Sequence, residues 1–308
     1  MINFRYHVVS LTAVFLALAI GLVVGTAALN GPVADSLHNN VNALRKNNEQ
    51  LREAVNSLET EVRREEDFVV EAAPILLGGK LAERRILVLT LPSGLDHVDG
   101  IVEMLTVAGA SVTGRVDLSD KFVNPDNSFD LLGLAAKAAR PTIPTNGLPG
   151  NSDGVETSSA LLASALLDRT DGITVTDADR KAALETYLNE GYLTASEKFT
   201  GPAEAVVVVN GQPHVDRDAA KKDAAVVRVV EQFDKAGVVV VAGSGSGAGN
   251  LVATVRNDPA LSKTISTVDN ASTIWGQVAT TLAVIEQLTL KRAGQYGLDG
   301  DSLLPKLS

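Results

Sequence analysis

LHNNVNALRKNNEQLREAVNSLETEV, residues 37–62, spaces its apolar residues alternately four and three apart. If Asn48 takes heptad position a, every a and d position of the run is filled by an apolar residue or by this one asparagine. The a positions are Val41, Asn48, Val55 and Val62, and the d positions are Leu37, Leu44, Leu51 and Leu58. β-Branched residues at a with leucine at d favour two parallel strands. The run therefore predicts a parallel dimeric coiled coil with these side chains at its interface.

Asn48 strengthens the prediction of a homodimer. An asparagine buried at position a finds its partner only when two chains align in parallel and in register, and it favours dimers over trimers. The alternative is a single amphipathic helix that lies on its own domain, which the same apolar spacing allows.

A long uncharged segment precedes the coiled coil. No Asp, Glu, Lys or Arg occurs between Arg5 and Asp35, and residues 8–29 provide the ~20 apolar residues that cross a bilayer. Because Arg5 precedes the span, we expect the amino terminus to be cytoplasmic and the rest of the chain to be extracytoplasmic. Gly21 and Gly25 form a small-xxx-small pair through which two such helices would pack closely.

A cleaved signal peptide is the alternative interpretation of this segment. Thr26, Ala27 and Ala28 are small enough for a cleavage site. The apolar run, however, is longer than the roughly 7 to 15 residues of an ordinary signal-peptide core, which favours an uncleaved membrane anchor.

Composition restricts the classes of partner. The chain has 308 residues and a net charge of -10, which disfavours binding to nucleic acid and to anionic lipid. Cysteine is absent, so disulfides and thiolate chemistry are excluded. We expect three parts: a cytoplasmic stub and membrane anchor (1–34), a coiled-coil stalk (35–73) and an extracytoplasmic domain (74–308).

From residue 74 onward, short apolar strands alternate with amphipathic helices, which is typical of a parallel α/β sheet. The predicted fold class is therefore α/β, with a mostly parallel, Rossmann-like extracytoplasmic body. The predicted strands are 86–91, 111–118, 205–209, 238–241 and 264–268. The predicted helices are 98–108, 129–140, 157–168, 176–190, 218–236, 251–256 and 274–291, with a loop at 141–154.

A glycine-rich loop follows the strand 238–241 and is the weak candidate for a cofactor site. A phosphate can be bound by backbone amides between a strand and a helix, and the glycines here are Gly243, Gly245, Gly247 and Gly249. The loop meets only a loosened dinucleotide fingerprint and has no P-loop lysine. A plain strand-to-helix connection is the favoured interpretation, so we predict no cofactor.

Other chemical sites have little support. Ser93, Asp96 and His97 are too close in sequence for a triad, and we expect Ser93 and Asp96 to shape the turn and cap the next helix. His97 and His214 are weak metal candidates, because they lie on different loops without ligand spacing. Met104 is the only internal methionine, so soft ligands for Cu(I) are scarce. We predict no catalytic residues and no metal site. One membrane helix cannot enclose a channel, and the strands lack the ~10-residue alternation of an outer-membrane barrel.

Both ends of the chain resemble one known family. YHVVSL (6–11) and FLALAIG (15–21), together with STVDN (266–270) and GQYG (294–297), are similar to signatures of the actinobacterial MctB copper transport protein family. That family also contains the cell-division protein SteB. The resemblance extends from the membrane anchor to the carboxyl-terminal segment.

The resemblance implies two different functions. One is copper efflux and copper homeostasis through an outer-membrane pore. The other is a membrane-anchored dimer that pairs with the cytoplasmic protein SteA and engages the coiled coil of a peptidoglycan hydrolase. No family metal ligand can be transferred to a residue of this chain.

The residues themselves favour a scaffold. Our leading hypothesis is a non-enzymatic, dimeric envelope protein that engages a partner coiled coil of the cell-wall and division machinery. Copper transport is the alternative, and a small-ligand sensor at the glycine-rich loop is the third hypothesis.

Overall fold

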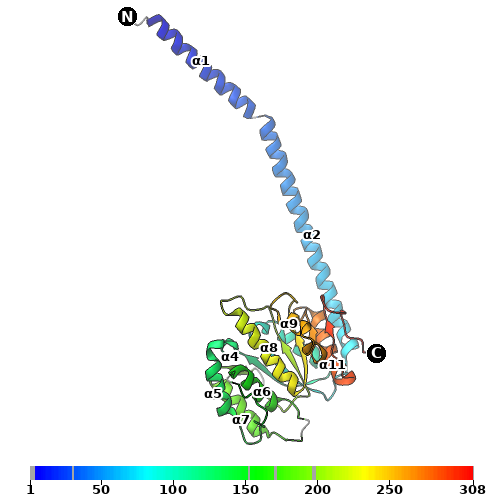
Figure 1. The fold of residues 1–308 in the computed structure, drawn as a ribbon. Helices are drawn as coiled ribbons and strands as arrows, with labels where there is room; N and C mark the ends of the chain where they lie inside the picture. Colours follow the sequence, from blue (N-terminus) through cyan, green and yellow to red (C-terminus); the bar gives the residue numbers. More distant parts are fainter. Residues whose placement is uncertain (1–3, 30, 152, 170–171, 196–198, 308) are drawn as a thin grey trace. The chain divides into compact units, whose positions relative to one another are not determined.

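The computed structural model describes residues 4–29, 31–151, 153–169, 172–195 and 199–307. The chain forms two compact units, Met1–Glu65 and Glu66–Ser308 (Figure 1). The boundary between the units falls before residue 73, where we predicted the stalk to end. We describe the two units separately.

The amino-terminal unit begins with the apolar helix α1 (Phe4–Leu29). Within it, Phe4–Ala27 has a mean hydropathy of 2.6 and is the one helix in the described residues long and apolar enough to cross a membrane. The apolar amino-terminal helix predicted from the sequence is therefore confirmed.

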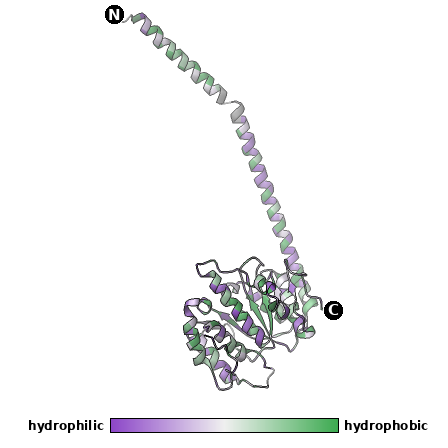
Figure 2. Cartoon of the chain, in the orientation of Figure 1, coloured by the Kyte–Doolittle hydropathy of each residue, from purple (hydrophilic) through white to green (hydrophobic). Residues whose placement is uncertain are grey.

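The second helix, α2 (Pro32–Leu77), is long because residues 33–73 contain neither glycine nor proline. Asp35 in its first turn complements the positive end of the helix dipole. Figure 2 shows apolar residues recurring among polar ones along it. The helix does not stop before Pro74, as we expected, but continues to Leu77. Proline removes one backbone donor there, whereas the last turn gains the burial of Leu77 and a bond of 2.9 Å from Gly78 N–H to the Pro74 carbonyl.

The second unit is a sheet with helices on both faces. The strands are β1 (Arg85–Thr90), β2 (Ser111–Leu118), β3 (Leu193–Ala195), β4 (Ala205–Val209), β5 (Val238–Ala242), β6 (Ser266–Val268) and β7 (Gln295–Tyr296). The helices after α2 are α3 (Val98–Val107), α4 (Asp120–Val123), α5 (Ser128–Ala138), α6 (Gly154–Leu166), α7 (Asp177–Asn189), α8 (Ala219–Ala236), α9 (Leu251–Asn257), α10 (Leu261–Thr264) and α11 (Ile274–Leu290), with 3₁₀ turns η1 (Pro92–Gly94) and η2 (Pro125–Asn127).

The strand order is β3-β2-β1-β4-β5-β6-β7, and every neighbouring pair is parallel except β2 with β3. In this register Leu89 of β1 lies between Val116 of β2 and Val208 of β4. The predicted mixed α/β fold with a mostly parallel sheet is therefore confirmed.

Continuous apolar runs form the central strands because both faces of the sheet are buried. Leu87, Leu89 and Val208 face one core, which α4 to α9 cover. Val88 and Val207 face the other, which α3, α11 and the last turns of α2 cover. Figure 1 shows α6 and α8 side by side on the first face.

The remaining differences from the sequence prediction lie at the edges of elements. Strands β3 and β7 and helix α4 were not predicted, because each is short and none has an apolar run of its own. Helix α6 starts at Gly154, earlier than predicted, because the Asp153 carboxylate accepts bonds from the amides of Val155 and Glu156 at 3.0 and 3.1 Å. The predicted strand 264–268 is divided between α10 and β6.

Candidate functional site

The apolar stripe of the predicted coiled coil is exposed on the single chain. The leucines at position d, Leu37, Leu44, Leu51 and Leu58, expose between 59% and 67% of their surface. Val41, Val55 and Val62 expose between 37% and 52%, and Asn48 is also exposed. A contiguous apolar stripe of this size on a soluble helix marks an interaction surface. The parallel homodimer remains a prediction, and these are the residues that would form it.

The apolar helix α1 presents its two predicted packing glycines without obstruction. A Cβ added at Gly21 or at Gly25 would meet no atom within 4 Å. Both positions therefore have room for the close approach of another helix.

Two glycine amides of the glycine-rich loop are engaged in bonds within the protein. Gly243 N–H donates to the Val268 carbonyl at 2.8 Å, and Gly245 N–H donates to the Asp269 carbonyl at 2.5 Å. The Asn250 side chain accepts from Val252 N–H at 2.8 Å and so caps the following helix α9. Two of the loop's glycine amides and one amide of the following helix are thus already used within the protein, which weakens the case for a phosphate site.

Carboxylates surround the same loop. Ser246 Oγ donates to Asp299 at 2.5 Å, and a Cβ added at Gly249 would lie 3.7 Å from a carboxylate oxygen of Asp223. Negative charge at these positions repels a phosphate group. The geometry therefore favours the plain connection over the cofactor site.

The edge where open α/β sheets usually bind ligands is closed in this protein. The strand order reverses between β1 and β4, and ligands bind such sheets beside the carboxyl ends of those strands. Here Ser93 Oγ donates to Asn210 Oδ1 and accepts from Gly211 N–H, each at 3.1 Å. A Cβ at Gly211 would lie 1.9 Å from the Ser93 carbonyl oxygen, and one at Gly94 would lie 2.3 Å from the Val209 carbonyl oxygen. The two loops pack directly on each other and fill the crevice.

These contacts correct one expectation. Ser93 binds the loop after β4 instead of capping α3, and the residue at the cap position, His97, makes no side-chain cap bond. A cap by Ser93 was expected from its residue type alone, but the close packing of the two loops engages its hydroxyl instead.

The two histidines named as weak metal candidates lie on different loops. His214 Nδ1 lies 2.8 Å from Asp223 Oδ1, whereas His97 precedes α3 on another loop. Within the described residues, no group of three or more His, Cys, Asp or Glu side chains is arranged to hold a metal ion. The donor set is therefore poor for copper, which prefers clustered thiolate, thioether or imidazole ligands.

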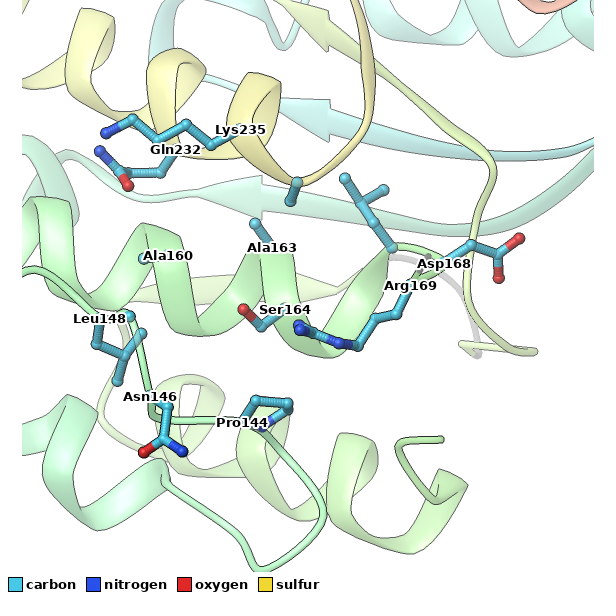
Figure 3. Close-up of a pocket in the computed structure, with 13 residues that line it drawn as sticks. Pro144, Asn146, Leu148, Ala160, Ala163, Ser164, Asp168, Arg169, Gln232 and Lys235 are labelled. Atoms are coloured by element: carbon cyan, nitrogen blue, oxygen red, sulfur yellow. The ribbon is translucent and has the colours of Figure 1, made fainter. Parts of the chain in front are cut away.

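A polar pocket of about 250 Å³, which the sequence did not reveal, lies between α6, α8 and the loop after α5 (Figure 3). Figure 3 shows Gln232 and Lys235 of α8 on one side, Asn146 on the other and Ser164 of α6 between them. Lys235 lies 4.0 Å from Glu156. Two lining residues lie near the starts of strands: Leu167 pairs with Ala203, just before β4, and Ala236 is followed closely by β5. The pocket therefore lies at the amino-terminal edge of these strands, opposite to the usual ligand site. No motif marks it, because its walls are helix ends and a loop.

The residues that carry the family resemblance at the carboxyl end form a hydrogen-bonded network. Asp269, whose side chain is 1% exposed, accepts bonds from the amides of Leu298 and Asp299 at 2.7 and 2.9 Å. Arg256 donates to Asp269 at 2.9 Å and to the Tyr296 carbonyl at 2.7 Å. This network fixes β7 to β6.

A second buried acid extends the network. Glu286 is fully buried and accepts from Tyr296 Oη and from the Arg292 guanidinium. Burial raises the pKa of the Tyr296 hydroxyl, and the bond to Glu286 raises it further, so this tyrosine stays protonated and donates. The signature residues thus have a structural role in completing the sheet.

The comparisons with known proteins cover almost the whole chain. The family model described as "Copper transport outer membrane protein, MctB" matches residues 1–305. Proteins named "Copper transporter MctB" from Mycobacterium tuberculosis (strain H37Rv) and Mycobacterium bovis are each 26% identical over 311 residues, which covers 96% of this chain and 96% of the relative. The protein of that name from Mycobacterium leprae is 27% identical over 307 residues, covering 97% of this chain and 96% of the relative.

Proposed function

The chain belongs to the MctB family, and from that premise we propose that it is a single-pass envelope protein that serves copper transport as a dimeric, non-enzymatic scaffold. The observation that carries the proposal is the exposed heptad stripe at residues 37–62, which follows a helix apolar enough to cross a membrane. An anchored chain with an exposed seam supports assembly in the plane of the membrane.

The proposed topology places the amino terminus in the cytoplasm and the α/β body outside. Arg5 precedes the span and Asp35 is the first charged residue after it, which agrees with the rule that positive charge stays inside. In this proposal the helix is an uncleaved anchor, and Gly21 and Gly25 support its pairing with a second copy.

Because the relatives are named "Copper transporter MctB", we propose copper as the transported substrate that this chain serves. The residues favour an indirect role, since the sequence has no cysteine and Met104 is 4% exposed in the core. The described residues offer no clustered ligands either. A scaffold for other copper-handling proteins fits this donor set better than a carrier or a pore.

A second candidate function rests on the same stripe. An exposed a/d seam with a polar Asn48 can also accept a helix from a partner coiled coil, by helix-in-groove recognition. A peptidoglycan hydrolase of the cell-wall and division machinery would be such a partner, and a cytoplasmic protein resembling SteA would bind the other side of the membrane.

The test compares two variants in cells that lack the chain. Leu44→Asp with Leu51→Asp places charge in the seam, whereas Ala43→Asp with Gln50→Asp adds the same charge at position c, away from it. We expect the wild type and the control to restore copper tolerance and normal copper content, and the seam variant to fail. Full restoration by the seam variant would contradict a dimeric scaffold.

Direct copper chemistry is tested separately on the purified full chain. Titration calorimetry with Cu(I) and with Cu(II) should show no tight stoichiometric binding, and planar bilayers should show no conductance. Tight copper binding would contradict the scaffold and indicate a carrier, and conductance in the bilayer would indicate a pore. A purified seam variant that associates with a coiled-coil hydrolase less well than the control would favour the second candidate.

A further inference from the structure

The heptad numbering of α2 continues into the second unit, where the chain's own body covers only one side of the helix. Val69 is the next a position after Val62, and Ala73 is an e position. Both are buried in the core together with Leu77, with 1% exposure or less. The a and e side of this segment is therefore occupied by the chain's own α/β body.

The g side of the same segment is apolar but uncovered. Phe68 and Ile75 are successive g positions, and they expose 64% and 84% of their surface. Of the charged residues of the segment, Asp67 at f and Glu71 at c lie away from the seam, whereas Glu66 at e borders it. The two most exposed large apolar side chains of the segment thus lie on one flank, while Val70 at position b is 46% exposed on the other, and such side chains indicate a surface that another molecule covers.

Two-fold symmetry identifies that molecule. In a parallel two-stranded coiled coil, position g of one helix lies beside position e of the other. Each chain carries its own body on its e side, and an isologous dimer gives both chains the same environment. The body of the second copy therefore arrives next to Phe68 and Ile75. We infer that these two side chains dock against the α/β body of the second copy. The inference rests on the proposed dimer.

Val69 closes one a position of this segment against the chain's own body, but the next d and a positions are less buried. Leu76 at position a is 37% exposed and Ala72 at position d is only partly buried, so both remain open to the partner helix. Burying large apolar side chains such as Phe and Ile stabilises an interface. Two such residues on each chain would hold the bodies together in addition to the coiled coil.

The absence of cysteine from the sequence permits a direct test. Single cysteines replace Phe68, Ile75 or the control Asp67 in the full chain, purified in detergent. The rate of maleimide labelling is measured in the native background and in the Leu44→Asp, Leu51→Asp background. A separate variant, Asn48→Cys, reports the dimer through an intermolecular disulfide formed under mild oxidation.

We expect cysteines at 68 and 75 to label about tenfold more slowly in the native background than in the seam-broken one. The cysteine at 67 should label equally in both. If Asn48→Cys crosslinks but 68 and 75 label as fast as 67, the dimer stands and the docking is overturned. Equal protection at 68 and 75 in both backgrounds also overturns it, because something other than a second copy then covers them. Failure of Asn48→Cys to crosslink removes the proposed dimer and the docking together.

Discussion

The two units of this protein differ in how much of their apolar side chains they expose. In the first unit, Phe15 and Leu44 expose 65% and 67% of their surface. In the second, Leu89 and Val207 are almost fully buried between helices. The first unit exposes the apolar surface that we propose a bilayer and a second chain cover, whereas most apolar residues of the second unit pack between its own helices and strands.

This difference shows where function is to be sought. The conspicuous motifs of the body, the glycine-rich loop and the carboxyl-terminal signature, make bonds within the body. The stripe at residues 37–62 has no such internal role. Variants in the two units should therefore have separable effects.

The largest expected effect is the loss of the dimer in the Leu44→Asp, Leu51→Asp variant. Replacing a buried leucine costs roughly 2–5 kcal/mol per site, and the introduced charges add to that cost. Analytical ultracentrifugation of the full chain in detergent should show monomers, while the Ala43→Asp, Gln50→Asp control stays dimeric. Fluorescence of the single tryptophan, Trp275, should report unchanged unfolding of the body. If the seam variant remained dimeric, the stripe would not be the surface through which the first unit assembles, and the proposed difference between the two units would be wrong.

The second effect lies within the body. Arg256→Met leaves the carboxylate of Asp269 buried without its guanidinium partner, which should lower the free energy of unfolding by about 3–5 kcal/mol. Denaturant titrations followed by Trp275 fluorescence measure the change.

The matched control is Arg228→Met. Its partner Asp153 lies at 3.1 Å, but the Arg228 side chain is 42% exposed, so the loss should stay below about 1 kcal/mol. In both variants, Asn48→Cys should still crosslink. Equal losses in the two arginine variants would argue against the buried network as the element that holds the sheet edge.

The third effect concerns specificity in the seam. Asn48→Val removes a buried polar group, which should raise coiled-coil stability by about 1–3 kcal/mol and allow species larger than dimers. Thermal melts and light scattering of the full chain measure the two changes. An unaltered assembly would show that Asn48 does not lie at the interface.

The smallest effect is a local pKa change in the body. The side chain and the amide of Thr142 donate to Asp179 at 2.6 and 2.9 Å and hold the pKa of that carboxyl below its ordinary value. Thr142→Val should raise this pKa toward the ordinary value, as an NMR titration would show. The pKa is lower in the folded than in the unfolded state, so the carboxylate stabilises the fold above its unfolded pKa. That contribution is lost as the pH falls through the folded pKa, and in the variant the contribution is smaller and its loss is complete at higher pH.

Thr106→Val serves as the control, because the Thr106 hydroxyl donates only to the Val102 carbonyl at 2.8 Å among the bonds described. It should leave the pKa of Asp179 unchanged. A similar change in both variants would mean that the shift comes from general charge effects, not from the Thr142 bonds.

The sequence predicted the central strands because each is a continuous apolar run, as at 205–209 and 238–241. It predicted the long helices from their apolar spacing. It missed β3 and β7, whose few residues are held by pairing with β2 and β6 and not by their own composition. Helix α2 passes Pro74 because tertiary burial of Leu77 outweighs the local preference of proline to end a helix.

The candidate sites were harder to predict than the fold. The heptad stripe depends only on local spacing, so its exposure on α2 followed from the sequence. The use of the Gly243 and Gly245 amides depends on bonds to residues 268 and 269, which spacing within the loop cannot show. The pocket beside Lys235 combines a loop and two helices that lie far apart in sequence, so no local signal marks it.

The carboxyl-terminal network has a consequence for biogenesis. Glu286 is synthesised before both of its partners, Arg292 and Tyr296, and Asp269 is synthesised after Arg256 but before the amides of Leu298 and Asp299 that complete its bonds. Until that later stretch emerges and docks, Glu286 has neither of these partners, Asp269 has only Arg256, and the β6 edge is open. An unfinished chain would therefore display a charged, unpaired edge by which proteases can distinguish it from the completed product.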